Sequence, residues 1–323
     1  MKNTYALIFV STTLATSMLF ANTNNILKES FLPAEGTFYF ESTYNLSKLD
    51  SKLKGPAGTV ADTKSTISTL QLGLGYGISD LFVIGAKAAY VGSQNIESTF
   101  GVGSTKNGTT ENYKSSGLID PEFIAMYRVG DYQKKRAKIH LLVGLSPKIQ
   151  NAKSSTATSN GNVANGNNRL RVGVTFYKEV KNTEFYITAQ RAYNSLSSSE
   201  NAADSTKTTE DDEHQSTGFK FGFLNSFSDD LSLGSELIFS VAEGYDSKSH
   251  TNTQLTSKVS YDSQNYTGVA FQGKYKLTDE SFVSARLEKL INAELSFSSG
   301  GTKLSSTDFN GIYITMAYTT TFE

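Results

Sequence analysis

Hydrophobic and polar residues alternate along most of the chain with a period of two. From Leu70 to Ile78, every second residue is Leu, Tyr or Ile, and the residues between them are Gln or Gly. Segments 170–176 and 219–223 repeat the pattern, with Leu, Val or Phe alternating with Arg, Lys, Thr or Gly. Such alternation is typical of β-strands that present one apolar and one polar face.

Twelve segments carry this signal. They predict strands at 36–46, 65–78, 81–95, 117–129, 137–149, 169–180, 184–195, 216–227, 231–245, 259–277, 281–297 and 308–322. The spans 259–277 and 281–297 are long enough for each to contain an extra turn.

The connections between these strands alternate strictly between short and long. Short ones, such as Ser79-Asp80 and 228–230, carry Ser, Thr and Asp, which stabilise tight turns by bonding their own backbone. Long polar ones are expected at 47–64, 96–116, 150–168, 196–215, 246–258 and 298–307. Short turns at one end and long loops at the other are typical of an outer-membrane barrel.

Composition agrees with an all-β transmembrane antiparallel up-and-down β-barrel of about twelve strands. Mean hydropathy is −0.31 and 38% of the residues are hydrophobic, which argues against a helical membrane protein but suits strands that are half apolar. A soluble β-sandwich is the competing fold. It is disfavoured because the faces opposite the apolar ones hold Gly and charges, and because sandwiches need no loop asymmetry.

Aromatic residues gather near the predicted strand ends, as in the two girdles of membrane barrels. One girdle is expected at the short-turn end, including Phe38, and the other includes Tyr44, Tyr90, Tyr193 and Tyr245. The last predicted strand places Phe322 on its outward face, the kind of C-terminal aromatic that the barrel-assembly machinery reads.

Three regions are expected along the chain. Residues 1–21 have the charged start and apolar stretch of a secretory signal peptide, with Ala21 before the cleavage point. Residues 22–35 form a short N-terminal segment in the periplasm or the lumen. Residues 36–323 form the barrel, so the expected location is the bacterial outer membrane.

In a barrel, the residues opposite the apolar face line the lumen. Leaving His140 aside, this parity places nine basic and five acidic residues inside or at the mouths, so the lumen is expected to carry net positive charge and to favour anions. The alternative is that these charges pair across the barrel and fill it. The residues proposed for the solute pathway are Lys87, Glu122, Arg128, Lys138, His140, Arg171, Lys220, Glu236, Lys274, Arg286 and Glu288.

Candidate catalytic chemistry is sparse. Absence of Cys excludes disulfides, thiolate metal sites and Cys nucleophiles, and the balanced charge of −1 gives no reason to expect nucleic acid as a partner. The three histidines, His140, His214 and His250, have no nucleophile and orienting group at a meaningful spacing. The acidic loop 196–215 lacks ordered calcium-ligand spacing. We therefore expect no enzyme, no cofactor and no metal site.

The segment from Gly117 to Arg128, GLIDPEFIAMYR, resembles the G-x-x-D-x-x-x-x-x-x-Y-R stretch of the MetA-pathway phenol-degradation family. The strand 143–148 and the hairpin 76–80 are similar to segments of the same family. This resemblance implies an outer-membrane barrel that passes small, often aromatic or apolar compounds.

Together these features predict an outer-membrane channel or facilitated-diffusion transporter for small solutes, anionic or aromatic in kind. Its expected partners are outer-membrane lipid and lipopolysaccharide, the solutes, and the barrel-assembly machinery through the C-terminal strand. The alternative is a surface-interaction barrel with a closed lumen, whose long external loops bind a partner.

Overall fold

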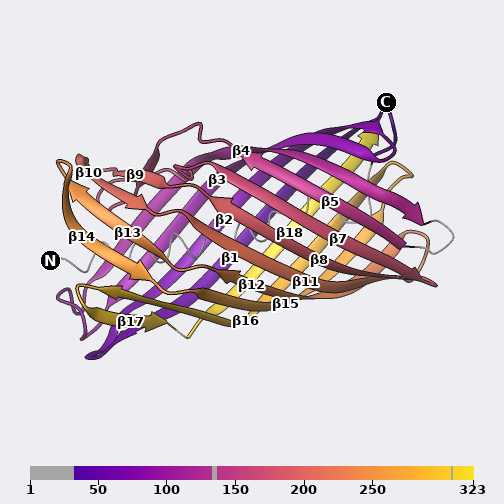
Figure 1. Ribbon diagram of the computed structural model, residues 1–323. Helices are drawn as coiled ribbons and strands as arrows, with labels where there is room; N and C mark the ends of the chain where they lie inside the picture. Colours follow the sequence, from indigo (N-terminus) through magenta and orange to yellow (C-terminus); the bar gives the residue numbers. More distant parts are fainter. Residues whose placement is uncertain (1–32, 133–136, 307) are drawn as a thin grey trace.

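The computed structural model describes residues 33–132, 137–306 and 308–323, and the regular elements in these ranges are all β-strands (Figure 1). The expected signal peptide and most of the segment 22–35 lie outside the described residues. Twelve long strands form the wall: β1 (Phe38–Gly55), β2 (Gly58–Ser79), β3 (Phe82–Phe100), β4 (Thr110–Tyr132), β5 (Ala137–Ser146), β7 (Arg169–Val180), β8 (Thr183–Asn194), β11 (His214–Ser226), β12 (Leu231–Ala242), β15 (Gln264–Lys276), β16 (Ser281–Ser299) and β18 (Asn310–Phe322).

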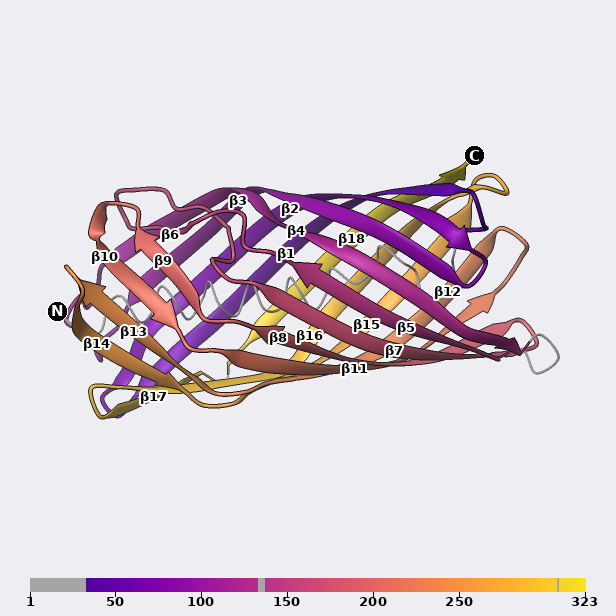
Figure 2. The ribbon, with the colours of Figure 1, turned by 45° about the horizontal axis from the view of Figure 1, so that its top comes forward.

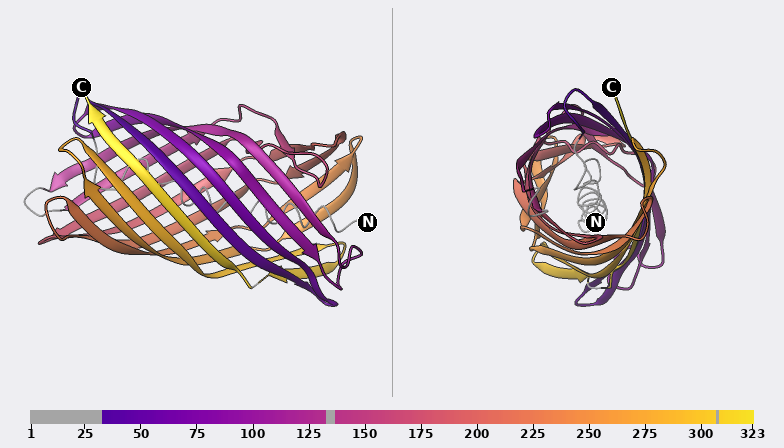
Figure 3. Two further views of the ribbon diagram at one scale, coloured as in Figure 1. Left: turned by 180° about the vertical axis from the view of Figure 1, so that it is seen from behind. Right: turned by 90° about the vertical axis from the view of Figure 1, so that its right-hand side faces the viewer.

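The long strands close into a barrel. Each pairs antiparallel with the long strands before and after it, and β1 also pairs with β18, from Phe38 opposite Phe322 to Asp50 opposite Asn310. Viewed along its axis, the sheet forms a ring (Figure 3). The prediction of a twelve-stranded antiparallel up-and-down barrel is therefore confirmed.

Much of the sequence expected to form long loops instead continues as strand. β1 runs to Gly55 and β2 starts at Gly58, so only two residues of the expected loop 47–64 form the turn. Short additional strands extend the wall at the same end (Figure 2). They are β6 (Ala152–Ser154), β9 (Ser197–Asn201), β10 (Asp204–Asp211), β13 (Tyr245–Thr251), β14 (Gln254–Tyr261) and β17 (Thr302–Ser306). We call this end the long-hairpin end and the opposite one the short-turn end.

Local residue chemistry explains several boundaries. The predicted strand 259–277 contains a break at 262–263 that separates β14 from β15. β5 ends at Ser146 rather than 149, directly before Pro147, which has no N–H to donate to a neighbouring strand. The turn between β16 and β17 consists of Gly300 and Gly301 with φ of 56° and 81°, the positive values that a two-residue type I′ hairpin requires.

Side chains alternate between the two faces of the wall. On the membrane-facing side of β2, Leu70, Leu72 and Leu74 are each 45–50% exposed, while Gln71 points inward and is buried. The inner face accommodates large side chains over glycines. A Cβ atom on Gly75 would lie 1.9 Å from the Tyr39 ring, so the glycine lets this tyrosine lie flat against the neighbouring strand.

The expected aromatic girdles are largely exposed on the outer surface. Phe38 stacks on Phe322 with ring centroids 5.7 Å apart, at the seam where β1 meets β18. Tyr44, Tyr90 and Tyr193 are exposed at the other predicted level. The prediction for Tyr245 is wrong, because its side chain points inward and is 6% exposed.

Candidate functional site

The first cluster of the inner face joins three of the predicted lumen residues. Glu122 on β4 accepts hydrogen bonds at both carboxylate oxygens from Arg171 on β7, each 2.9 Å long. Lys87 Nζ on β3 lies 2.6 Å from the same carboxylate. All three side chains are buried. A Cβ on Gly144 would lie 2.4 Å from Glu122 Oε1, so the glycine of the intervening β5 leaves room for this bridge.

A second cluster joins three more predicted residues on β12 and β16. Arg286 Nε donates to Glu236 Oε2 at 2.9 Å, and Arg286 Nη1 lies 2.6 Å from Glu288 Oε2. The Tyr186 hydroxyl donates to Glu236 Oε1 at 2.5 Å and accepts from Gln272 Nε2 at 2.6 Å. Tyr186 reaches this position over Gly222, where a Cβ would lie 2.4 Å from its ring.

These clusters have opposite net charge when every group is ionised. Two bases and one acid give the first cluster a charge of +1, and one base and two acids give the second −1. We name the two clusters together the charged belt. The pairs join near-neighbour strands along the inner face, and the charges of these six residues sum to zero, whereas counting residues predicts a net positive lumen.

The remaining five predicted residues lie outside these ion-paired clusters. His140 is buried on β5 with its ring centroid 4.9 Å from that of Tyr177. Arg128 and Lys138 are partly exposed on β4 and β5. Lys274 Nζ lies 4.0 Å from the centroid of the Phe282 ring, in a cation–π contact. Lys220 is buried on β11.

Toward the long-hairpin end, the polarity of the two faces is reversed. On β1, Lys48, Asp50 and Lys52 are exposed, while Leu49 and Leu53 point inward and are buried. Many of the buried apolar residues here form one contiguous cluster, which we name the apolar inner wall, while Ile96 and Tyr113 form a separate pair. The apolar inner wall includes Leu49, Leu53, Val60, Phe100, Tyr245, Val259, Tyr261, Leu295, Phe297 and Leu304.

A row of rings crosses this wall. His214 stacks on Tyr245 at 4.5 Å, Tyr245 on Tyr261 at 4.7 Å, and Tyr261 contacts Phe297 at 5.5 Å between ring centroids. Sequence reasoning missed this surface. The sequence carries the signal, since apolar residues alternate with Lys and Asp at 48–54, but the polar outer face makes this segment resemble a loop.

One acidic side chain is buried beside these rings. Asp211 on β10 accepts a hydrogen bond from the Ser197 hydroxyl at 3.2 Å. Burial raises the pKa of the Asp211 carboxyl to about 6, and the neighbouring Asp212 adds to the rise. Burial likewise raises the pKa of the Tyr261 hydroxyl and lowers that of His214. This part of the wall therefore favours neutral forms of its titratable groups.

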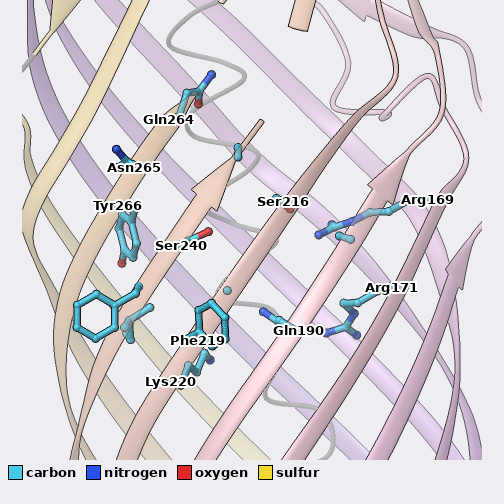
Figure 4. Close-up of a pocket in the computed structure, with 15 residues that line it drawn as sticks. Arg169, Arg171, Gln190, Ser216, Phe219, Lys220, Ser240, Gln264, Asn265 and Tyr266 are labelled. Atoms are coloured by element: carbon cyan, nitrogen blue, oxygen red, sulfur yellow. The ribbon is translucent and has the colours of Figure 1, made fainter. Parts of the chain in front are cut away.

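Five adjacent strands, β7, β8, β11, β12 and β15, enclose a hollow of about 60 Å³ on the inner face (Figure 4). Arg169, Arg171 and Gln190 lie on one side of it, and Gln264, Asn265 and Tyr266 lie on the other. Lys220 lies at one end (Figure 4). Two of the lining residues, Arg171 and Lys220, belong to the predicted solute pathway.

Neither metal-binding nor membrane-helix features are found in the described ranges. No group of three His, Cys, Asp or Glu side chains there could hold a metal ion. The acidic segment 196–215 instead folds as the β9–β10 hairpin, with Asp212 paired to Lys248 at 2.7 Å. No helix in those ranges is long and apolar enough to cross a membrane.

Comparison with solved structures gives a clear match for the fold. The COG4313 outer membrane channel from Pseudomonas putida F1 superposes with a TM-score of 0.59, covering 91% of this chain and 98% of that one, at 13% sequence identity. The fold is that of an outer-membrane β-barrel. The family resemblance in the segment 117–128 is therefore confirmed at the level of the fold.

More distant similarities include a transporter and a protease. The P. putida toluene transporter TodX matches with a TM-score of 0.39 and 12% identity over 93% of each chain. The outer membrane protease OmpT from Escherichia coli matches with a TM-score of 0.35 and 11% identity over 91% of this chain and 99% of that one. No protein-family model matches the sequence, and no curated protein matches it significantly.

Proposed function

We propose that the protein is an outer-membrane channel that admits small solutes carrying an apolar part, by passive or facilitated diffusion. The observation that carries this proposal is the change along the inner face, from the apolar inner wall to the charged belt. An apolar surface facing inward above the membrane concentrates apolar groups, because burying them releases ordered water. The long-hairpin end would then face outside the cell.

The charged belt would act as the filter. Its two clusters sum to zero, while Arg169 and Lys220 beside them add positive charge, so neutral solutes and singly charged anions would pass more readily than multiply charged ones. The proposed solute pathway therefore runs past Lys87, Glu122 and Arg171, and then past Glu236, Arg286 and Glu288. The fold of the COG4313 channel supports the general assignment.

Planar-bilayer recording under a salt gradient tests the proposal. We expect discrete conductance steps with weak anion preference, and stronger anion preference in Glu122→Gln, which removes one negative charge from the belt. Control recordings would use Glu97→Gln, an exposed carboxylate on β3 beyond the belt. Folded protein that gives no steps would overturn the channel and would favour the alternative, a closed barrel whose external hairpins bind a partner.

A further inference from the structure

The hollow on the inner face is built by the register of its five strands. In one row, Arg171 pairs with Ala192, Ala192 with Ser216, and Ser216 with Ala242. In the next row, Gln190 pairs with Gly218, and Gly218 with Ser240. Three strands, β8, β11 and β12, thus present small residues at neighbouring inward positions, while longer side chains stand around them. The hollow therefore results from aligned small residues on adjacent strands, not from one small residue alone.

The charged residues that line this hollow are all basic. Its lining includes Arg169, Arg171 and Lys220 but no Asp or Glu. Arg171 is held by Glu122 in a two-point ion pair. Lys220 differs, because within the described ranges no hydrogen bond or ion pair to its ammonium is found, although the residue is only 5% exposed.

The acid that interacts with Lys220 is already engaged by other side chains. Glu236 interacts electrostatically with Lys220, but its two oxygens accept hydrogen bonds from Tyr186 and Arg286. An anion that reaches an ammonium without a direct protein partner gains a charge-assisted hydrogen bond. An anionic ligand in this hollow would therefore give Lys220 a direct hydrogen-bond partner.

The volume of the hollow and the residues that line it indicate which kind of anion it would bind. A hollow of about 60 Å³ has room for a few water molecules, hence for a head group rather than a whole ring. Ile238, Ala192 and the Tyr266 ring contribute apolar surface beside the cations. One unpartnered positive charge with apolar neighbours suits a singly charged carboxylate better than a fully hydrated phosphate.

We propose that this hollow is a binding site for the carboxylate of a small monocarboxylic acid, held by Lys220 with Arg169 and Gln190 alongside. The inference rests on the proposed channel function, since the solute would meet the site along the lumen, and it deepens that function by naming the solute's head group. The apolar remainder of the solute would extend toward Ile238 and Tyr266.

Calorimetric titration of the purified, folded full chain in detergent tests the site with butyrate, and with butyramide as its neutral analogue. We expect butyrate to bind at least tenfold more tightly than butyramide. Lys220→Met should lose at least tenfold in butyrate affinity, and Lys220→Arg should retain part of it. Lys64→Met is the control, since Lys64 is exposed on the outer side of β2 and lies outside the solute pathway, and it should bind like the wild type.

Several outcomes overturn the site. Equal binding of butyrate and butyramide, no butyrate binding, or unchanged binding by Lys220→Met would each do so. Inorganic phosphate that displaces butyrate at equal concentration would show an anion site without preference for carboxylate. Heat-modified gel mobility, which differs between folded and unfolded barrels, confirms that each variant is folded before titration.

Bilayer recordings on the same preparation separate the two proposals. Conductance steps without butyrate binding would remove the site and leave the channel. Butyrate binding without steps would keep the site and remove the channel.

Discussion

The lipid-facing part of the barrel and its extension at the long-hairpin end use the same strands with opposite polarity. In the lipid-facing part of β2, Leu70, Leu72 and Leu74 face outward and Gln71 faces inward. Nearer the long-hairpin end of the same strand, Lys64 is outside and Ile67 is buried inside. The period of two is unchanged. What changes is the solvent on the outer side, because lipid favours apolar side chains and water favours Lys, Asp and Thr.

This comparison teaches that the phase of an alternating pattern has no meaning until the surroundings of the strand are known. A Leu between two charged residues marks the outer face in one zone and the inner face in the other. It also explains why the inner surface has two characters, the charged belt within the lipid-facing part and the apolar inner wall beyond it.

The largest effect is expected from removing a charge from the charged belt. Glu122→Gln leaves the buried Lys87 and Arg171 facing each other without their shared carboxylate, so the free energy of unfolding should fall by about 3–5 kcal/mol. Urea unfolding in phospholipid vesicles, followed by circular dichroism, measures the loss. Arg171→Met keeps the Lys87–Glu122 pair and should lose less. A loss below about 1 kcal/mol in Glu122→Gln would contradict burial of the pair, since exposed pairs contribute about that much or less.

The next test compares two positions on the outer face of one strand. Leu74→Lys places a charge at the centre of the lipid-facing run 70–78 and should cost about 2–4 kcal/mol. Thr66→Lys, outward on the same strand but in the extension, should change stability by less than about 0.5 kcal/mol. Unfolding in vesicles measures both. Equal effects of the two lysines would contradict the change of solvent between these positions.

A third test addresses the apolar inner wall through pH. The pKa of Asp211 is about 6 when folded, above its ordinary value near 4, so the folded state binds the proton more tightly. The contribution of Asp211 to the free energy of unfolding is therefore largest near pH 4 and decreases as pH rises to about 6, by about 2–3 kcal/mol.

Asp211→Asn should remove this dependence, so the difference between variant and wild type should change by that amount between pH 4 and pH 7. Measuring both proteins at each pH cancels the titration of other groups. Asp50→Asn is the control, because Asp50 is exposed on the outer side of β1 and is not among the groups that shift the pKa of Asp211. Parallel pH profiles for Asp211→Asn and wild type would contradict a buried carboxyl among the rings.

The smallest effect is expected at the short-turn end. Asp279 is paired with Lys276 at 2.5 Å, but its side chain is 95% exposed, so solvent screens the pair. Asp279→Asn should leave the urea midpoint unchanged, in contrast to Glu122→Gln. A clear shift of the midpoint would show that this turn contributes to the register of β15 and β16.

Sequence reasoning predicted the strand number, the closure and most of the inward charges, because alternation between lipid and lumen is strong where the outer face is Leu or Phe. It failed where the outer face becomes polar, and segments such as 47–55 therefore read as loops. Partners could not be predicted either. Glu122 and Arg171 are 49 residues apart, and their contact depends on Gly144 of the strand between them.

β1 and β18 pair at the seam in the same way as two neighbouring strands that a short turn connects. Phe38 and Phe322 stack there as cross-strand neighbours do elsewhere in the wall. A circularly permuted chain, opened at the short turn between β15 and β16 and joined across the seam, would keep every strand pair of the ring. The order in which the strands are synthesised could thus be changed while the finished barrel stays the same, which separates the pathway of assembly from its product.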